Sequence, residues 1–488
     1  TGSGKSMVPV YMHKAFFDVL HKNTVTTEPK VLTTIEITEG TVSFSGLKME
    51  ETIGYQTGQF HKRPIRGIVF MTTGVLVMQL KNYTDEELMK KYMIIIIDEC
   101  HDRDVNNDML MFLLKEFLGR NYANPACPMV ILMSATFDEE LFSTYFDVPK
   151  SNYIECKGLT YEVAQHFPET QVTNIIADIT EKIRSIHINN IDDLKLAPGE
   201  NRNKSIRDII VFCDTSSTIV KLAEQVERLN ETDEVKTAGL LMPIYLDRIN
   251  YGLGAEAYRN FKLPPSELRW HGQEIARRVI FTTTFAETGI TIDGLKYCID
   301  TGVSLQVNFN PIFNATRIAS RAVSQDMAVQ RRGRVGRKAP GVWYPTYTKA
   351  MFESMLVSKY PDILRTDISE LLLGVIVAEY NKATAAGTVF DFDVTDLDIM
   401  GYPSVDSFEY TLHKLSHLGF VTSTPEVYGP KQGAVIPTHL GDFATKIAKM
   451  SLENSRMILA GYYWGANVRD LITIAAFTEV GWKDIMEK

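Results

Sequence analysis

A short run of glycines, a lysine and a serine opens the chain as Gly2-Ser3-Gly4-Lys5-Ser6. Glycines at this spacing let backbone N–H groups face a phosphate, and a helix that starts here favours an anion. Lys5 is placed to neutralise β- and γ-phosphates, and Ser6 to hold Mg²⁺ through its hydroxyl. The run is typical of the second half of a loop that binds a nucleoside triphosphate. The leading glycine of the full pattern would lie before residue 1, and the run taken alone also fits an accidental turn.

Two carboxylates, Asp98 and Glu99, follow a run of four isoleucines. The isoleucines predict a buried central strand, so both carboxylates would stand at its carboxyl end. Asp98 is placed to bind the Mg²⁺ complex through water, and Glu99 to share that ion and to deprotonate an attacking water. The alternative is a strand that runs into a solvated acidic turn. His101 has no second ligand to support a metal role, so we interpret it as a hydrogen-bonded structural residue.

Arginines at three-residue spacing lie in the segment Gln330–Arg337. The spacing predicts one helix that carries Arg331, Arg334 and Arg337 on a single face. Two glycines would thin this helix so that another surface can approach, and their cost to helix stability suggests a functional reason. We assign Arg334 and Arg337 to the phosphates and Gln330 to the attacking water. The alternative is a basic solvated helix or a patch that binds nucleic acid.

Buried β-branched runs separated by helical segments predict the elements that position these residues. Six runs read as strands of parallel sheets: 66–73, 92–98, 128–134, 208–213, 277–283 and 297–301. This alternation predicts an α/β fold in two blocks, about 1–160 and 161–348, with ligands at the carboxyl ends of the strands. Ser134 and Thr136 follow one of these strands. Their hydroxyls could link the nucleotide site to a strand site, and a plain turn fits them equally well.

The strand pattern stops after residue 348. Residues 361–380 and 404–418 read as helices, and 420–422 with 434–437 as a small hairpin. Two helices and a hairpin predict a winged-helix unit. Residues 441–488 read as helical again, so two α/β blocks would be followed by a winged helix and further helices.

Bulk composition bounds the class of protein. The chain has 488 residues, 45% of them hydrophobic and 23% charged, which is ordinary for a globular protein with room for about three domains. No apolar run approaches the roughly 18 residues that span a bilayer, so we expect no membrane partner. The five cysteines form no CxxC pair, which argues against a zinc site. A net charge of -9 argues mildly against a protein that coats nucleic acid through bulk charge.

With these residues in hand, the chain resembles the DEAH and RNA-helicase-A group of superfamily 2 helicases. The resemblance follows the family's order along nearly the whole chain. Residues 98–101 read DECH where the family has DEAH, and the segments that look like motifs I, III, V and VI are 2–6, 134–136, 283–294 and 330–337. Residues 27–30 resemble motif Ia, where the family has a Gln-Pro-Arg-Arg segment that grips a phosphate. Residues 73–76 resemble the segment that leads to motif Ib.

This resemblance implies further site residues. Four of them would contact the backbone of RNA: Lys30, Thr73, Gly74 and Thr283. Thr288 would lie near the catalytic site and Asp293 near the ribose of the nucleotide, although for each residue of motif V the alternative is a capped turn. A β-hairpin that helps to separate strands would lie at 302–321.

The same resemblance implies the fold class: α/β, with two tandem RecA-like parallel-sheet domains followed by a winged-helix domain and a truncated, ratchet-like helical domain. The first RecA-like domain, truncated at its N-terminus, would span 1–160 and the second 161–348. The winged-helix domain would span 349–440, and the helical domain would begin at 441–488.

The function implied is that of an NTP-dependent RNA helicase. Such an enzyme uses ATP or another NTP, with Mg²⁺, to move 3′-to-5′ on single-stranded RNA and to unwind RNA duplexes. Three alternatives stay open: an RNA-stimulated NTPase that remodels RNA–protein complexes, a DNA helicase, and a nucleotide-gated module without turnover, against which Glu99 argues. DECH together with Arg332 in motif VI is more like viral members, similar to the poxvirus nucleoside triphosphate phosphohydrolase II group. We therefore expect a viral origin and a location in the host cytoplasm or virion.

Overall fold

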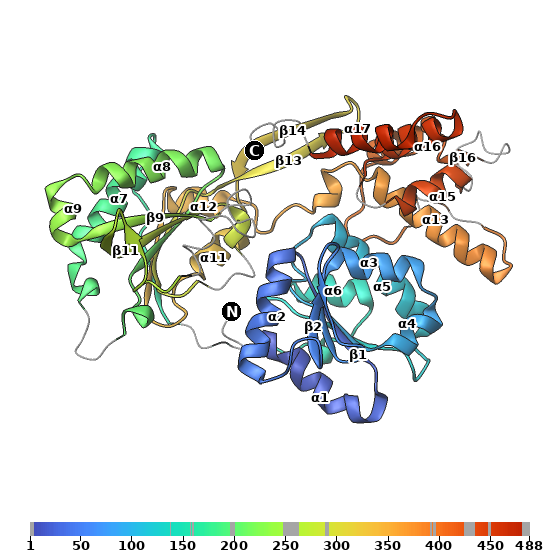
Figure 1. The fold of residues 1–488 in the computed structure, drawn as a ribbon, viewed down its shortest axis with the longest axis horizontal. Helices are drawn as coiled ribbons and strands as arrows, with labels where there is room; N and C mark the ends of the chain where they lie inside the picture. The colour runs from blue at the N-terminus through green and yellow to red at the C-terminus, as the bar shows by residue number, and fades with distance from the viewer. Residues whose placement is uncertain are drawn as a thin grey trace.

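In the computed structural model the chain folds into three successive regions, coloured blue, green to yellow, and orange to red in Figure 1. Two of these regions contain mainly parallel sheets covered by helices, which confirms the predicted α/β class. The residues that the structure describes are 4–136, 138–156, 158, 161–195, 201–246, 263–287, 292–390, 393, 397–423, 435–447 and 450–480.

The first region contains a six-stranded sheet in the order β3-β2-β4-β1-β5-β6. All neighbouring strands are parallel except β2 and β3. The strands are β1 (Asn23–Glu28), β2 (Ile53–Gln56), β3 (His61–Lys62), β4 (Ile68–Thr72), β5 (Tyr92–Ile97) and β6 (Met129–Leu132). One face packs against α1 (Val8–Leu20) and α2 (Val31–Ser45), and the other against α3 (Thr73–Asn82), α4 (Asp85–Lys91) and α5 (Val105–Asn121). A short helix, α6 (Glu139–Phe146), follows β6.

The isoleucine run forms β5, as predicted, and all six residues of this strand are buried. Ile94 and Ile96 pack on the side of α1, whereas Ile95 and Ile97 pack on the side of α3 and α5. A strand buried on both faces needs apolar side chains at every position, which is why the pattern was readable in the sequence. Its neighbour β1 was not predicted, because its threonines read as polar although their branched side chains suit a strand.

The second region contains a seven-stranded sheet in the order β10-β11-β8-β12-β15-β7, with β9 also paired to β11. Its strands are β7 (Val163–Gln165), β8 (Asp208–Phe212), β9 (Leu240–Leu246), β10 (Arg269–Trp270), β11 (Gln273–Thr282), β12 (Leu295–Asp300) and β15 (Gly341–Pro345). One face packs against α7 (Ile175–Asn189), α8 (Ser216–Leu229) and α9 (Asp233–Ala238), and the other against α11 (Gln325–Arg332). The helix α12 (Lys349–Ser354) follows β15.

A hairpin leaves the second sheet between β12 and α11, which confirms the hairpin expected at 302–321. It consists of the antiparallel strands β13 (Val303–Asn310) and β14 (Ala315–Ala322). Most of its residues are exposed, and Figure 1 shows it extending away from the sheet that carries it. The backbone N–H of Phe309 donates to the carbonyl oxygen of Arg365 at 2.8 Å, so the third region contacts the hairpin.

The third region begins with two helices and a small antiparallel hairpin, the arrangement predicted for a winged helix. These elements are α13 (Ser369–Ala386), α14 (Val405–His417), β16 (Val421–Ser423) and β17 (Val435–Pro437). The helix predicted at 361–380 starts later, because Pro361 precedes a 3₁₀ turn and α13 begins only at Ser369. The helices α15 (His439–Lys446), α16 (Leu452–Tyr463) and α17 (Val468–Val480) follow, and Thr438 caps α15.

The first and third regions share one hydrophobic core. Leu76 of α3 and Leu114 of α5 belong to the same buried cluster as Leu372 of α13 and Phe408 of α14. The second region has two buried clusters of its own, one on each face of its sheet. The molecule therefore consists of two packed bodies, and the contacts between these bodies are described below.

Among the helices that the structure describes, we find none with the length and apolar character needed to cross a membrane.

Candidate active site

The lysine of the phosphate-loop motif meets the DECH carboxylates at the carboxyl end of the first sheet. A 3₁₀ turn at Lys5–Met7 leads into α1, and β5 ends immediately before Asp98. The Lys5 Nζ lies 3.2 Å from Asp98 Oδ1 and 3.2 Å from Glu99 Oε1. All three side chains are mostly buried, so their charges act on one another more strongly than they would in water.

Burial and neighbouring charges shift the pKa values of these three side chains in different directions. Burial acts to lower the pKa of Lys5, but the charges of Asp98 and Glu99 raise it above its ordinary value. Burial raises the pKa of Asp98. Burial acts in the same direction on Glu99, yet the charge of Lys5 lowers the pKa of Glu99 overall. Glu99 therefore favours the ionised form that a base requires, and its φ of 50° is the kind of backbone strain that clusters at functional positions.

Two further members of the predicted loop are described, and three predicted residues are not. Gly4 has a φ of 80°, in the left-handed region that glycine adopts without strain, and Ser6 is exposed beside Lys5. Ser6, Asp98 and Glu99 together offer one hydroxyl and two carboxylates, the oxygen donors that Mg²⁺ prefers. Within the described residues, no cluster of three or more His, Cys, Asp or Glu side chains offers another metal site. The predicted residues outside the described part of the chain are Gly2, Ser3 and Thr288.

A chain of hydrogen bonds runs through His101 and links the second region to the first. Gln330 Nε2 lies 2.9 Å from His101 Nε2, and Ser134 Oγ lies 2.7 Å from His101 Nδ1. An amide nitrogen only donates, so His101 Nε2 accepts, and its Nδ1–H donates to Ser134. Ser134 Oγ in turn donates to the carbonyl oxygen of Thr136. The hydrogen-bonded role expected of His101 is confirmed. Gln330 bonds to this ring, and its role toward the attacking water stays a prediction.

The helix predicted over 330–337 is wrong. α11 ends at Arg332, and Gly336 in the turn that follows has a φ of 75°. A Cβ atom at Gly336 would lie 2.5 Å from the Val163 side chain, so this glycine is needed for close packing as well as for its conformation. The three arginines therefore do not share a helix face. Arg331 is 0% exposed inside the second region, whereas Arg334 and Arg337 lie beyond the helix end.

Buried Arg334 and partly buried Arg337 lie close enough for their charges to interact, and the charge of Arg334 also interacts with that of Glu99. Burial and the like charge of Arg337 lower the pKa of Arg334 to about 9, while the charge of Glu99 acts in the opposite direction. Arg334 Nη2 donates to the carbonyl oxygen of Glu287. Arg337 Nε donates to the carbonyl oxygen of Gly333 at 3.3 Å, and its Nη2 is buried without a hydrogen-bond partner in the described part of the chain. Two such groups side by side favour an anion between the regions.

Thr73 and Gly74 form the first turn of α3, at the carboxyl end of β4. The Thr73 hydroxyl is buried and lies 3.4 Å from the carbonyl oxygen of Glu28 and 3.2 Å from Oδ1 of Asn107. This hydroxyl already has partners within the protein. A nucleic-acid strand could therefore be contacted by the backbone N–H groups of the turn, and not by the Thr73 side chain.

Other residues predicted to contact the RNA backbone or the nucleotide also have partners within the protein. Lys30 Nζ donates to the carbonyl oxygen of Thr284 at 3.3 Å, which makes a second contact between the first and second regions. The Thr283 hydroxyl accepts a hydrogen bond from a backbone N–H two residues later, so it caps a turn, the alternative raised for motif V. Asp293 is exposed and forms an ion pair with Lys338 at 2.6 Å.

Glu28 is a buried acidic residue of this site whose role was not predicted. It ends β1, next to β5 in the sheet, and is 0% exposed. Neither carboxylate oxygen has a hydrogen-bond partner among the described residues, and burial together with the charges of Asp98 and Glu99 raises the pKa well above its ordinary value. The sequence signal was an acidic residue at the end of a strand, but the strand itself was not recognised.

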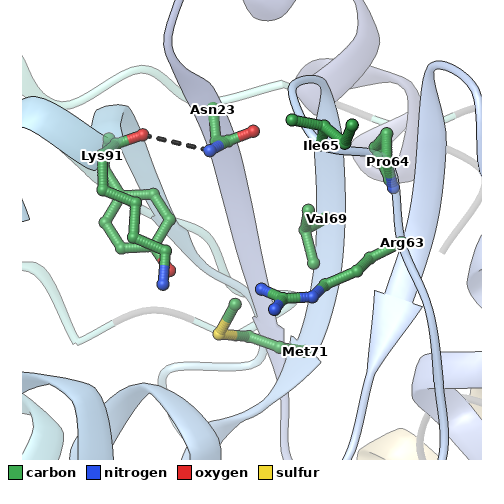
Figure 2. A pocket seen from close by; sticks show the side chains of 8 residues that line it. Asn23, Arg63, Pro64, Ile65, Val69, Met71 and Lys91 are labelled. Atoms are coloured by element: carbon green, nitrogen blue, oxygen red, sulfur yellow. Dashed lines mark hydrogen bonds between the residues drawn. The ribbon is translucent and has the colours of Figure 1, made fainter.

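A pocket of about 380 Å³ lies at the opposite end of the first sheet. Asn23 and Tyr92, which begin β1 and β5, line it together with Arg63, Met71 and Lys91. Figure 2 shows these side chains around the pocket, with the hydrogen bond from Asn23 to the Lys91 carbonyl oxygen. None of the predicted site residues lines this pocket, so the candidate site is defined by the contacts at the carboxyl ends of the strands.

Comparison with known proteins gives one family match and several relatives. The helicase conserved C-terminal domain matches residues 187–339. The B962L protein of African swine fever virus is 31% identical over 99% of this chain and 51% of its own length. ATP-dependent RNA helicase DHX33 of Drosophila melanogaster is 28% identical over 88% of this chain and 56% of its own length. The chain thus spans about half the length of these relatives, and the viral one agrees with the expected viral origin.

A solved structure shares the fold. The DEAH/RHA helicase HrpB of Escherichia coli matches with a TM-score of 0.70 and 21% sequence identity. The match covers 98% of this chain and 53% of that protein. It supports the reading of the two sheets as tandem RecA-like domains.

Proposed function

We propose that this chain, which is similar to helicases of the DEAH/RHA type, hydrolyses a nucleoside triphosphate and uses the energy to move 3′-to-5′ along RNA and unwind duplexes. The observation that carries this proposal is the meeting of Lys5, Asp98 and Glu99 in the first region, beside His101, which is hydrogen-bonded to Gln330 of the second region. Hydrolysis needs charge neutralisation and a base at one place, and these residues supply both.

Each residue has a separate task in this proposal. Lys5 binds the β- and γ-phosphates, and Arg334 and Arg337 stabilise the charge that develops on the transferred phosphoryl group. Glu99 orients and deprotonates the attacking water; its Oε2 has no hydrogen-bond partner in the described part of the chain. Ser6, Asp98 and Glu99 would hold Mg²⁺, which supplies further neutralisation of the phosphate charge.

Movement follows from contacts that depend on the nucleotide. The charge of Arg334 in the second region interacts with that of Glu99 in the first, so a bound triphosphate would draw the regions together and its hydrolysis would release them. Backbone contacts made by turns such as Thr73-Gly74 would grip a strand without reading its sequence. The relative DHX33 is named an ATP-dependent RNA helicase, which supports RNA as the nucleic acid along which this chain moves.

A strand-displacement assay tests the substrate and the direction. The purified protein receives ATP, Mg²⁺ and a duplex whose single-stranded overhang is ribo or deoxy and lies at the 3′ or the 5′ end. We expect displacement with the 3′ ribo overhang, and none with Lys5→Ala as the matched control. Hydrolysis without displacement would instead support the remodelling NTPase, and equal use of the deoxy overhang would support a DNA helicase.

A further inference from the structure

Arg331 lies in sequence between two residues that face the first region, but its own side chain points into the second region. It is 0% exposed. Its Nε lies 2.7 Å from Glu287 Oε1, and its Nη1 lies 2.7 Å from Asp300 Oδ1. If any one of these three groups moved away, a charge would be left unpaired and away from water. The buried cation and its two carboxylates therefore stay together as one rigid arrangement.

The partners of Arg331 belong to two different parts of the machinery. On one side, the carbonyl oxygen of Glu287 accepts a hydrogen bond from Arg334, whose charge interacts with that of Glu99. On the other side, Arg331 Nη2 donates to the carbonyl oxygen of Val303 at 3.2 Å, and Val303 is the first residue of β13. The turn that faces the nucleotide and the root of the hairpin therefore meet at one guanidinium group.

Asp300 completes this junction at the end of β12. Its Oδ1 also accepts the backbone N–H of Gly302 at 2.9 Å, and its Oδ2 accepts the Tyr347 hydroxyl at 2.8 Å. Gly302 cannot easily become another residue, because it has a φ of 70° and a Cβ atom would lie 2.4 Å from the Tyr347 ring. The junction thus fixes the direction in which the hairpin leaves the sheet.

We propose that Arg331 is a positioning residue that couples the nucleotide-facing turn to the hairpin β13–β14. It touches neither nucleotide nor strand. Instead it holds Glu287 and Val303 in one rigid unit, so a shift of Arg334 when nucleotide binds moves the root of β13. This inference rests on the proposed function and adds to it the route by which the nucleotide site reaches the hairpin.

The test compares variants that break the junction with a matched control. Arg331→Lys keeps the charge, but an ammonium group cannot reproduce the planar fork that binds two carboxylates and a carbonyl oxygen together. If that variant does not fold, the neutral combination Arg331→Met, Glu287→Gln and Asp300→Asn leaves no buried charge unpaired. The control is Arg277→Met: this arginine is also buried, at 1% exposure, but donates to Asn190 on another part of the second region.

Two readouts are taken. The first is hydrogen exchange of the β13 amides with and without a non-hydrolysable ATP analogue. The second is base pairs opened per ATP, together with kcat and KM for ATP. We expect nucleotide to change β13 exchange in the wild type and in Arg277→Met, but not in the junction variants. In those variants kcat should fall roughly ten- to hundred-fold with KM nearly unchanged, and fewer base pairs should open per ATP.

A nucleotide-dependent change in β13 that persists in a folded junction variant would overturn the coupling. So would an unchanged yield of base pairs per ATP. If the wild type binds the analogue but never hydrolyses ATP, the proposed function fails, and the exchange readout still decides the coupling on its own.

Discussion

The charged residues of the site differ from ordinary surface charges in how completely they are enclosed. Lys5, Asp98 and Glu99 stabilise one another in a mostly buried group, and Gln330 reaches them through His101. Low exposure makes each of these contacts worth more than it would be in water, and also makes it costly to lose. At this scale the most informative contact is the one between Gln330 and His101, because its two partners lie in different regions.

We predict that Gln330→Ala and His101→Ala each lower kcat for ATP by about ten-fold, with little change in KM, because each removes the hydrogen bond that joins the two regions during hydrolysis. The double variant should be no slower than the slower single variant, since both changes remove the same contact. Steady-state ATPase kinetics of the four proteins check this. Fully multiplicative losses in the double variant would mean that the two side chains act independently.

Elements that are buried on both faces could be predicted from the sequence, and those whose partners are distant could not. The isoleucines of β5 gave a clear signal, and so did the hydrophobic and hairpin patterns of the third region. β1 was missed because its threonines are polar in composition and buried only through its place between β4 and β5. The regular spacing of the arginines predicts a helix where the structure has a turn after α11. The spacing carries no information on Glu287 and Asp300, which are distant in the sequence and bind Arg331.

The helix α7 carries a histidine that should make stability depend on pH. His187 is 0% exposed, its Nε2 bonds to the carbonyl oxygen of Gly239 at 2.7 Å, and burial lowers its pKa to about 4. The folded state therefore keeps this ring neutral while the unfolded chain binds a proton below its ordinary pKa of 6.5. Stability from this group is full above that value and is lost as the pH falls toward about 4.

We predict that His187→Gln loses less stability than the wild type over this range, by up to about 3 kcal/mol. Glutamine can keep the hydrogen bond to Gly239 and does not titrate. Urea unfolding of the second region between about pH 7 and pH 4 checks this, with the exposed His61→Gln as control. Parallel pH profiles for His187→Gln and the wild type would contradict the assignment.

For the whole molecule, the arrangement of cores suggests which parts move. The first and third regions share a hydrophobic core, whereas the second meets them through separate contacts: polar ones such as the hydrogen bond from Lys30 to Thr284, and a few apolar ones such as Leu32 of α2. Polar contacts can break and re-form at low cost, so opening and closing should occur between the second region and the other two. The hairpin crosses this division, since it grows from the second region and contacts Arg365 and Tyr410 of the third.

We predict that Tyr410→Ala separates unwinding from hydrolysis. The Tyr410 hydroxyl donates to Asn314 Oδ1 at 2.5 Å, and its ring lies 5.1 Å from that of Phe309, so the change removes two contacts that hold the hairpin to the third region and leaves those of Arg365. The rate of strand displacement should fall about three- to ten-fold, as expected for the loss of one or two such contacts, while ATP hydrolysis stays within about two-fold. Tyr462→Ala, which changes an exposed ring on α16, is the control. An equal fall in both activities would place Tyr410 in general stability instead.

The central claim is that Glu99 drives a hydrolysis that depends on RNA. The measurement is ATP turnover by the wild type and by Glu99→Gln, each with and without single-stranded RNA, together with ATP binding by both proteins. We predict that RNA raises turnover by the wild type, and that Glu99→Gln binds ATP but loses turnover by about a hundred-fold or more, because the amide cannot accept the proton of water. Turnover that ignores RNA, or that survives in Glu99→Gln, would contradict the account.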